Sequence, residues 1–465
     1  MLFSSISFLY VFLPVTLLLY FLVPARAKNY VLLAASLLFY FFGEPVYVIL
    51  LILSSVSDYL HSLFIESHRG KKSAKTALIS SIIVNMAMLG FFKYIDFFIG
   101  SFNGLFGTQL PLTGVPLPIG ISFFTFQTMS YTIDVYRGEA KAERNLASFA
   151  TFVCLFPQLI AGPIVRYTDI SAELHSRKHD LDGTYQGVRR FIFGLAKKVL
   201  IANAMGELCT IFRQSTDPSV VFYWIYAIAF SLQIYFDFSG YSDMAIGLGR
   251  IFGFHFPENF DYPFISRSIT EFWRRWHMTL GGWFRDYLYI PLGGNRKGTA
   301  RWLLNIAIVW AATGFWHGAA WNFILWGLFF GVLLILEKLF LLKWLEKAGA
   351  VVRHLYVILM VLMSFVIFNA STMNELWTDL RGLFGSVPLW SAETGYYLQS
   401  YALLLIFALI GATPLLKRLW SRISATRGGA AVSTIAEPLT AAILLLVVTA
   451  YLVDGSFNPF LYFRF

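Results

Sequence analysis

Repeated apolar stretches of about 20 residues are the feature that most constrains this chain. Two clear ones run over 46–64 and 319–341. A stretch of this length crosses the hydrocarbon core of a bilayer as an α-helix, which satisfies all of its backbone hydrogen bonds internally. Hydrophobic residues make up 57% of the chain and charged residues only 13%, against roughly a quarter in soluble domains. The sequence therefore predicts an all-α, polytopic membrane protein, with one membrane domain over 1–465.

Basic loops alternate with weakly charged loops and predict the topology. The first apolar run ends before Arg26 and Lys28, which places the N-terminus outside and these two residues in the cytoplasm. Retention of basic loops also explains the formal charge of +10, so nucleic acid is not implied. We expect about 11–12 transmembrane helices. They lie near 7–23, 30–43, 46–64, 77–94, 118–136, 191–211, 220–248, 302–316, 319–341, 355–370, 397–415 and 437–453.

Three segments do not fit simple spans. The segment 149–163 is apolar but short and interrupted by prolines, which favours a re-entrant or buried hairpin. The segment 166–190 is polar and predicts a cytoplasmic surface segment, and 95–117 predicts an external loop containing Gly and Pro. The segment 250–301 lacks a span yet is rich in Trp, Phe, Tyr and Arg. We expect short helices there that dip into the bilayer and line a cavity.

His317 interrupts apolar sequence between two spans, in the run Gly314–Asn322. Ionisable groups inside a membrane are costly, so they are functional candidates. A neutral imidazole suits proton removal from a hydroxyl that attacks a thioester, and the glycines beside it would leave room for a substrate. The alternative is a structural histidine hydrogen-bonded to a neighbouring helix.

A second candidate region covers 271–287. Helical spacing would place Arg274 with His277, and Glu271 with Arg275, on shared faces. The arginines could meet the phosphates of coenzyme A or phosphopantetheine, and His277 could assist catalysis. The alternative is an interfacial helix whose arginines reach lipid headgroups.

Asp237 and Asp243 form a third candidate. They are too far apart on a helix to act as a pair, so we expect each to be ion-paired, for instance with Arg274, Arg275 or Arg285, in the wall of a cavity. Cys154 and Cys209 have neither Cys-x-x-Cys spacing nor nearby histidine ligands, so neither a disulfide nor a metal site is expected.

Together these segments resemble the membrane-bound O-acyltransferase (MBOAT) superfamily, and within it the bacterial branch of alginate and cellulose O-acetyltransferases. The most specific matches are Phe272–Leu280 and Phe315–Gly318, and the resemblance runs from Phe8–Pro14 to Asn458–Phe463. It implies the MBOAT fold, with helices around a central tunnel and a core at 115–345. It also implies that His317 is the essential catalytic residue and His277 the second active-site residue. The residues expected to line the tunnel or the donor site are Arg274, Trp276, Trp316, Asn322, Asp237, Tyr241 and Arg285.

The resemblance further implies a reaction in the bacterial inner membrane. The donor would be acetyl-CoA or an acyl carrier thioester on the cytoplasmic side, with no permanently bound cofactor and no metal. The acetyl group would pass to periplasmic SGNH-type acetyltransferase partners that modify an exopolysaccharide. Two alternatives remain open at this point: a transporter or flippase that forms no bonds, and an acyltransferase for teichoic acid, lipid or protein.

Overall fold

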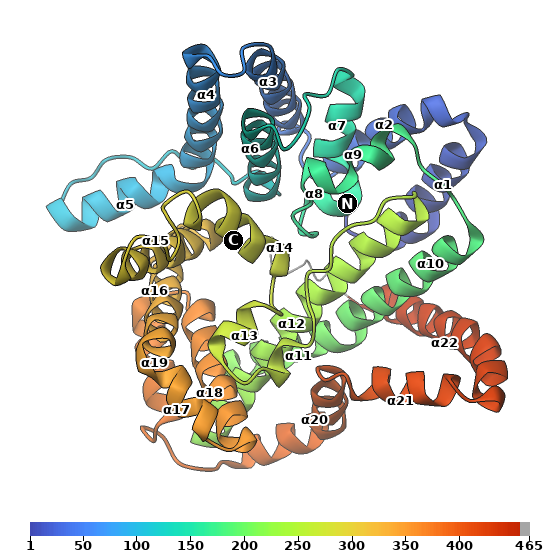
Figure 1. The fold of residues 1–465 in the computed structure, drawn as a ribbon. Coiled ribbons are helices and arrows are strands. Elements are labelled where there is room, and N and C mark those ends of the chain that lie inside the picture. The colour runs from blue at the N-terminus through green and yellow to red at the C-terminus, as the bar shows by residue number, and fades with distance from the viewer. Residues whose placement is uncertain (456–465) are drawn as a thin grey trace. The chain divides into compact units, whose positions relative to one another are not determined.

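The computed structural model describes residues 1–455, and these residues form helices and connecting loops without a β-strand (Figure 1). The motif at Asn458–Phe463 lies outside the described residues. The chain divides into two compact units, one of residues 1–191 with 242–257 and one of residues 192–241 with 258 onward. Helices α10 (Leu181–Ala196) and α12 (Val220–Ile251) pass from one unit into the other. The all-α prediction is confirmed.

Seven helical stretches in the described part of the chain are long and apolar enough to cross a membrane, so the chain is a multi-pass membrane protein. The other five expected spans coincide with helices that are shorter or more polar. The first of these is the apolar stretch Phe8–Leu22. The seven stretches are Val48–Ser67, Lys72–Phe106, Val220–Ile251, Trp321–Lys347, Ala350–Asn369, Ala392–Gly411 and Gly428–Asp454.

The first unit is a group of helices held together by buried polar contacts. Its helices are α1 (Leu13–Leu22), α2 (Lys28–Phe41), α3 (Val48–Ser67), α4 (Lys72–Leu89), α5 (Ile95–Phe106), α6 (Ile121–Arg137), α7 (Leu146–Cys154), α8 (Phe156–Leu159) and α9 (Tyr167–His175). Asp58 of α3 is fully buried and accepts hydrogen bonds from Ser81 and Asn85 of α4, each at 2.7 Å. These bonds compensate the carboxylate for its loss of water.

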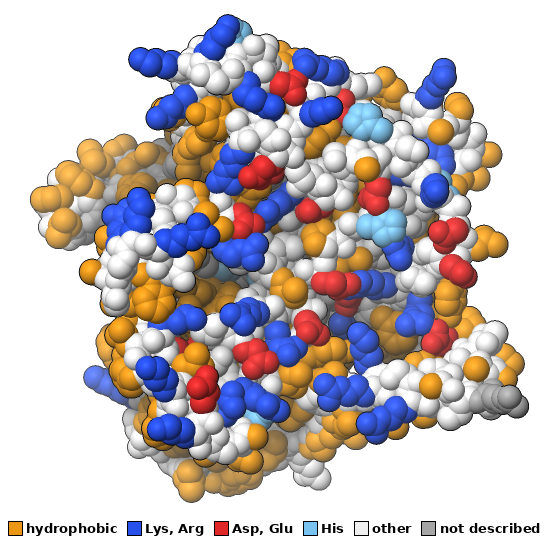
Figure 2. Space-filling view, in the orientation of Figure 1, with side chains coloured by type: hydrophobic (Ala, Val, Ile, Leu, Met, Phe, Trp, Pro, Cys, Tyr) orange, Lys and Arg blue, Asp and Glu red, His pale blue; other side chains and the backbone are white. Residues whose placement is uncertain are grey.

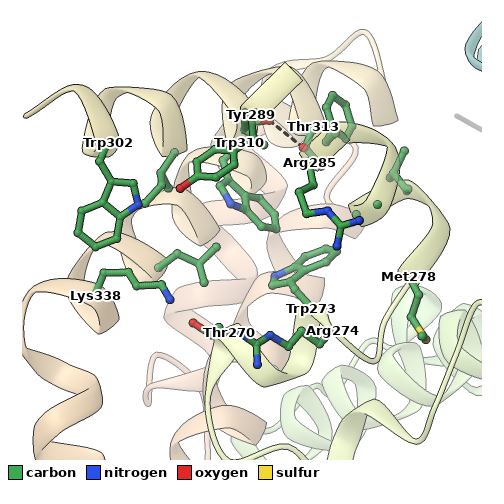
Figure 3. Close-up of a pocket in the computed structure, with 17 residues that line it drawn as sticks. Thr270, Trp273, Arg274, Met278, Arg285, Tyr289, Trp302, Trp310, Thr313 and Lys338 are labelled. Atoms are coloured by element: carbon green, nitrogen blue, oxygen red, sulfur yellow. Dashed lines mark hydrogen bonds between the residues drawn. The ribbon is translucent and has the colours of Figure 1, made fainter. Parts of the chain in front are cut away.

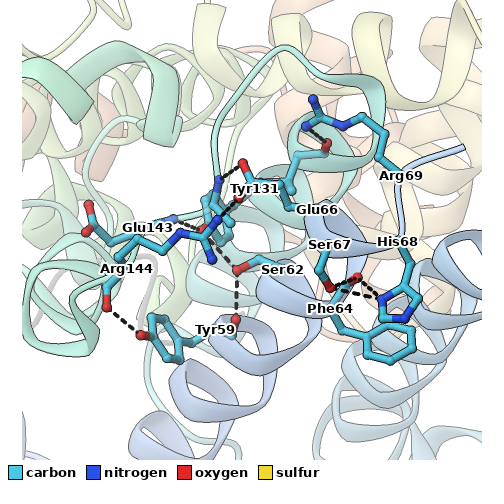
Figure 4. A network of polar contacts seen from close by, with 12 residues as sticks. Tyr59, Ser62, Phe64, Glu66, Ser67, His68, Arg69, Tyr131, Glu143 and Arg144 are labelled. Carbon is cyan, nitrogen blue, oxygen red and sulfur yellow. Dashed lines mark hydrogen bonds and ion pairs between the residues drawn. The ribbon is translucent and has the colours of Figure 1, made fainter.

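A second polar network ties the end of α3 to the loop after α6 (Figure 4). Glu66 pairs with Arg144 and accepts a bond from the Ala142 backbone at 2.9 Å. Tyr131 donates to Ser62 at 3.0 Å. The bonds of Glu66 join α3 to the loop before α7, the bond of Tyr131 joins α6 to α3, and together they fix the entrance to α7.

Of two expectations for the first unit, one is partly wrong and the other agrees with the structure. The prediction of an external loop over 95–117 is wrong in its first half, because α5 occupies 95–106. Its apolar residues recur every three or four positions, which is helical spacing, and Figure 2 shows hydrophobic side chains over this segment. The segment 149–163 forms α7 and α8, and residues 151–165 are all buried, as expected for a buried hairpin. Gly120 allows the close approach: with φ +77°, a Cβ there would lie 2.7 Å from the Leu159 carbonyl oxygen.

The second unit contains every residue expected to be catalytic or to line the tunnel or the donor site. Its helices after α12 are α13 (Ile269–Trp273), α14 (Met278–Phe284), η6 (Arg285–Tyr289), α15 (Thr299–His317), α16 (Trp321–Leu336), η7 (Glu337–Leu341), α17 (Leu342–Lys347), α18 (Ala350–Asn369), α19 (Met373–Leu383), α20 (Ala392–Gly411), α21 (Leu415–Ser424) and α22 (Arg427–Asp454). Before α12 lie η4 (Lys197–Ala202) and α11 (Asn203–Gln214). The short helices expected in 250–301 are present as α13, α14 and η6.

Glycines let α15 and α16 pack at backbone distance. A Cβ on Gly314 would collide with the Phe323 carbonyl oxygen, and one on Gly327 with the Trp310 carbonyl oxygen. A Cβ on Gly318 would overlap the Phe323 ring. The expectation that Gly314 and Gly318 leave room for a substrate beside His317 is therefore wrong, because α16 fills that room.

Candidate active site

His277 occupies a strained turn between two short helices. Ser268 caps α13 by accepting from the Glu271 N–H at 3.0 Å, and the helix ends at Trp273. His277 then adopts φ 44° and ψ 53°, a left-handed conformation that is uncommon for residues other than glycine. The predicted helical face shared by Arg274 and His277 does not form, because α13 stops first. Glu271 and Arg275, the other two residues expected on a shared face, do lie together and form an ion pair at 3.1 Å.

The tautomer of His277 follows from its buried neighbour Asn259. The Asn259 Oδ1 accepts hydrogen bonds from the Thr279 N–H at 3.3 Å and from the Thr279 hydroxyl at 2.9 Å, so this atom is the amide oxygen. The His277 Nδ1, 3.1 Å away, must then donate to it. Burial lowers the pKa of His277 to about 3, so the ring is neutral near pH 7.

A neutral imidazole with its proton on Nδ1 keeps a lone pair on Nε2. Within residues 1–455, the buried Nε2 of His277 has no hydrogen-bond partner. His277 therefore presents an oriented proton acceptor that the folded chain itself does not use.

His317 is the last residue of α15 and is 3% exposed. Its ring centroid lies 4.8 Å from that of Trp326 and 5.6 Å from that of Phe368. Trp316 joins the two histidines, since its ring centroid is 5.0 Å from that of His317 and 6.0 Å from that of His277. The fold thus brings the two predicted catalytic histidines to one buried aromatic cluster.

A cavity of about 550 Å³ lies beside this cluster, and we call it the cationic cavity (Figure 3). Arg274, Arg285 and Lys338 bring positive charge to it, and Trp302 and Trp310 supply aromatic walls. Figure 3 shows Arg285 and Lys338 extending into the space from different sides. The lining consists of Thr270, Trp273, Arg274, Met278, Leu280, Gly281, Gly282, Phe284, Arg285, Tyr289, Trp302, Ile306, Val309, Trp310, Thr313, Leu334 and Lys338.

Neither histidine lines the cationic cavity directly. Met278, which does, follows His277 in the chain, and Thr313 lies one helical turn before His317. Trp326 connects the two regions. Its ring centroid is 5.7 Å from that of the cavity-lining Trp273 and 4.8 Å from that of His317. A layer of aromatic rings therefore separates the cavity from His317.

The other predicted tunnel residues have different positions. Arg274 and Arg285 line the cationic cavity, whereas Trp276, Trp316, Asn322, Asp237 and Tyr241 do not. Trp276 is buried and its ring packs 5.2 Å from that of Phe365. Asn322 donates to the Phe368 carbonyl at 2.9 Å, which fixes the backbone of a residue that contacts His317. Tyr241 is buried in α12, one turn after Asp237.

Asp237 has a partner that differs from those expected from the sequence. It pairs with Lys198 at 2.6 Å, with both side chains 3% exposed, so the expected pairing with Arg274, Arg275 or Arg285 is wrong. Arg275 instead pairs with Asp261 and Glu271, and Arg285 with Asp286. Lys198 lies within the apolar segment 191–211, and a charged residue in such a segment indicates a buried partner of opposite charge. Asn259 and Lys338 were also missed, and only Lys338, near the end of an apolar run, carried a signal in the sequence.

Comparison with known proteins identifies the class. The model of the MBOAT family, the membrane-bound O-acyltransferases, matches residues 138–377, which include both histidines and the cationic cavity. The chain belongs to this family and is a membrane-bound O-acyltransferase that uses an acyl donor.

Named relatives narrow the comparison. The chain is 39% identical to the probable alginate O-acetylase AlgI of Azotobacter vinelandii over the full length of both proteins. It is 42% identical to the probable alginate O-acetylase AlgI of Pseudomonas aeruginosa, with 83% of this chain and 75% of that one covered. It is 35% identical to the peptidoglycan O-acetyltransferase of Helicobacter pylori, with 83% of this chain and 80% of that one covered.

Proposed function

We propose that this enzyme transfers an acetyl group from a cytoplasmic thioester to a hydroxyl outside the bacterial inner membrane. The transfer serves O-acetylation of an exopolysaccharide such as alginate or cellulose. The relatives named as alginate O-acetylases support the acetyl group and the polymer class. The whole chain acts as one membrane domain with its N-terminus outside, as the distribution of basic loops indicates.

One observation carries the proposed mechanism: two buried histidines meet around Trp316, beside a cavity lined with cations. His317 takes the proton from the acceptor hydroxyl as its oxygen attacks the thioester carbonyl. The tetrahedral intermediate then expels the thiolate, which takes the proton from His317. His277, kept neutral by burial and held in one tautomer by Asn259, accepts at Nε2 a hydrogen bond from an N–H or a second hydroxyl of the bound donor or acceptor and so positions it. General-base assistance of this kind contributes about 10²- to 10⁴-fold in rate.

The cationic cavity suits the donor, for which we propose acetyl-CoA. Arginine guanidinium groups bind phosphate oxygens in pairs, and lysine adds a point charge. Trp302 and Trp310 offer faces on which a nucleobase can stack. The volume of about 550 Å³ lies within the usual range for small-molecule sites. An acyl carrier thioester would present the same pantetheine arm with one phosphate. Outside the membrane, SGNH-type acetyltransferases would take the acetyl group onward.

Thiol release separates this proposal from a transporter or flippase. Purified protein with labelled acetyl-CoA should release free coenzyme A slowly alone and faster with an acceptor, whereas a transporter would release none. His317→Ala should abolish release while the protein remains folded. A Cys154→Ser/Cys209→Ser double variant should keep its activity, because the mechanism needs no acyl-enzyme. Release unchanged in His317→Ala would remove the assignment.

A further inference from the structure

A second cavity, of about 300 Å³, lies in the same unit as the two histidines. We call it the amide cavity, because carboxamide side chains dominate its polar lining. It is formed by α11, α12 and the last residue of α18. The polar groups that matter below are Asn203, Gln214, Gln233, Asn369, Thr210 and Glu207.

The carboxamides of this cavity are not explained by helix packing alone. A carboxamide that faces lipid, or that is buried without a hydrogen-bond partner, destabilises the fold. Asn369 donates to the Tyr226 hydroxyl at 2.6 Å, but the buried Oδ1 of Asn203 has no partner within residues 1–455. Gly206 makes room for Gln233, since a Cβ there would lie 2.5 Å from the Gln233 Nε2. Each carboxamide offers both donors and acceptors, which is what a hydroxyl group needs.

The charges around the amide cavity disfavour an anionic ligand. Arg213 lines it, but its guanidinium is held by Asp379 in two bonds of 2.7 Å and by Glu375 at 3.0 Å. Asp379 is 2% exposed. With Glu207 added, one cation stands against three carboxylates. A ligand carboxylate would find no uncommitted cation on this lining and would meet repulsion.

The amide cavity is connected to His317 through a different aromatic neighbour than the cationic cavity is, by way of its lining residue Asn369. Asn369 follows Phe368, whose ring is 5.6 Å from that of His317. The cationic cavity is connected through Trp326, whose ring is 4.8 Å from that of His317. His317 therefore contacts one aromatic ring that packs on a wall residue of the cationic cavity, and another whose chain neighbour lines the amide cavity.

We propose that the amide cavity is the acceptor site and that it takes an uncharged alcohol while rejecting a sugar that carries a carboxylate. This inference rests on the proposed function. It means that a polyuronate is not the immediate acceptor. A neutral carrier hydroxyl, from a neutral sugar residue or a hydroxyl-bearing side chain, takes the acetyl group first.

Three small probes test the inference with purified full-length protein and labelled acetyl-CoA. They are methyl glucoside, methyl glucuronide, in which a carboxylate replaces the C6 hydroxymethyl group of the same ring, and N-acetylserinamide. The rate of thiol release and of acetyl ester formation should rise with at least one neutral probe, and kcat/KM for the glucuronide should be at least 10-fold lower. The neutral probe that works identifies the source, a sugar residue or a serine side chain.

Two variants place the effect in the amide cavity. Glu207→Gln removes one negative charge, so the preference for glucoside over glucuronide should fall about 10-fold. Glu346→Gln, on the exposed face of α17, is the matched control and should leave the preference unchanged. Asn203→Leu should raise KM for the neutral probe at least 5-fold.

Three results would overturn the inference. Equal kcat/KM values for methyl glucuronide and methyl glucoside would exclude a preference for uncharged acceptors. An unchanged preference in Glu207→Gln, or an unchanged KM in Asn203→Leu, would place the acceptor elsewhere while leaving the acyltransferase intact. Absence of thiol release in every sample, by contrast, would reject the proposed function and this inference with it.

Discussion

Replacing Asn259 by alanine tests how the buried histidine is oriented. Asn259 is fully buried, and its side-chain oxygen is the acceptor for the His277 Nδ1–H. The variant keeps the bond from the Met278 N–H to the Asn259 carbonyl at 3.0 Å, so the turn itself should survive. It leaves a buried N–H unpaired, which costs about 1–3 kcal/mol. Because this cost destabilises the tautomer of His277 that carries its proton on Nδ1, kcat/KM should drop roughly 10- to 100-fold.

The assay is thiol release from acetyl-CoA with a saturating acceptor, combined with thermal unfolding in detergent. Thr279→Val is the matched control, since it removes a different donor from the same oxygen and leaves the His277 bond; it should cost less than about threefold. Asn259→Asp keeps an oxygen acceptor and should recover much of the lost activity. Its negative charge raises the pKa of His277, so His277 becomes protonated at a higher pH. When the pH is lowered, this variant should therefore lose activity before the wild type does. Activity within twofold of wild type in Asn259→Ala would refute the reasoning.

Three further predictions concern the ion pair, the helix contact and the donor cavity. Lys198→Met should lower the free energy of unfolding by about 3–5 kcal/mol, because it leaves Asp237 buried without its cation. Adding Asp237→Leu to this variant should raise its melting temperature part of the way back to that of the wild type. A double variant that melts no higher than Lys198→Met would contradict the pairing. Gly314→Val should reduce the yield of folded protein in size-exclusion chromatography, since the added carbons meet the backbone of α16. Gly281→Ala is the control that should be tolerated, because the nearest atom to its Cβ would be 3.8 Å away. Arg274→Gln should raise KM for acetyl-CoA about 10-fold, and Arg274→Lys should give a smaller increase. A KM in Arg274→Gln equal to that of the wild type would exclude a phosphate contact.

The sequence was sufficient for the class of fold, because bilayer thickness imposes a length and an apolarity that can be read directly. It was less informative about individual elements. Gly and Pro favoured a loop over 95–117, yet the apolar spacing of 95–106 was strong enough to continue the helix. The glycines at 314 and 318 looked like space beside a catalytic residue, but whether such space stays empty depends on the neighbouring helix.

The site was predictable in composition more than in geometry. His277 and His317 were both named from motifs, and the structure brings them to one cluster through Trp316, which no spacing rule could show. The end of α13 before Arg274 was hidden, because no glycine marks the left-handed turn at His277. The partner of Asp237 could not be chosen among several cations without the three-dimensional fold. Buried ion pairs are a property of packing, which the sequence does not encode locally.

A sealed-vesicle experiment tests the central claim most directly. The protein is reconstituted with acetyl-CoA, labelled in both the acetyl group and the coenzyme, on the face that bears the cationic cavity, and with a neutral acceptor on the other face. Acetyl ester should appear on the acceptor side while free coenzyme A stays on the donor side, and His317→Ala should eliminate both products. Acetyl and coenzyme labels crossing together, or a His317→Ala variant as active as the wild type, would contradict the account.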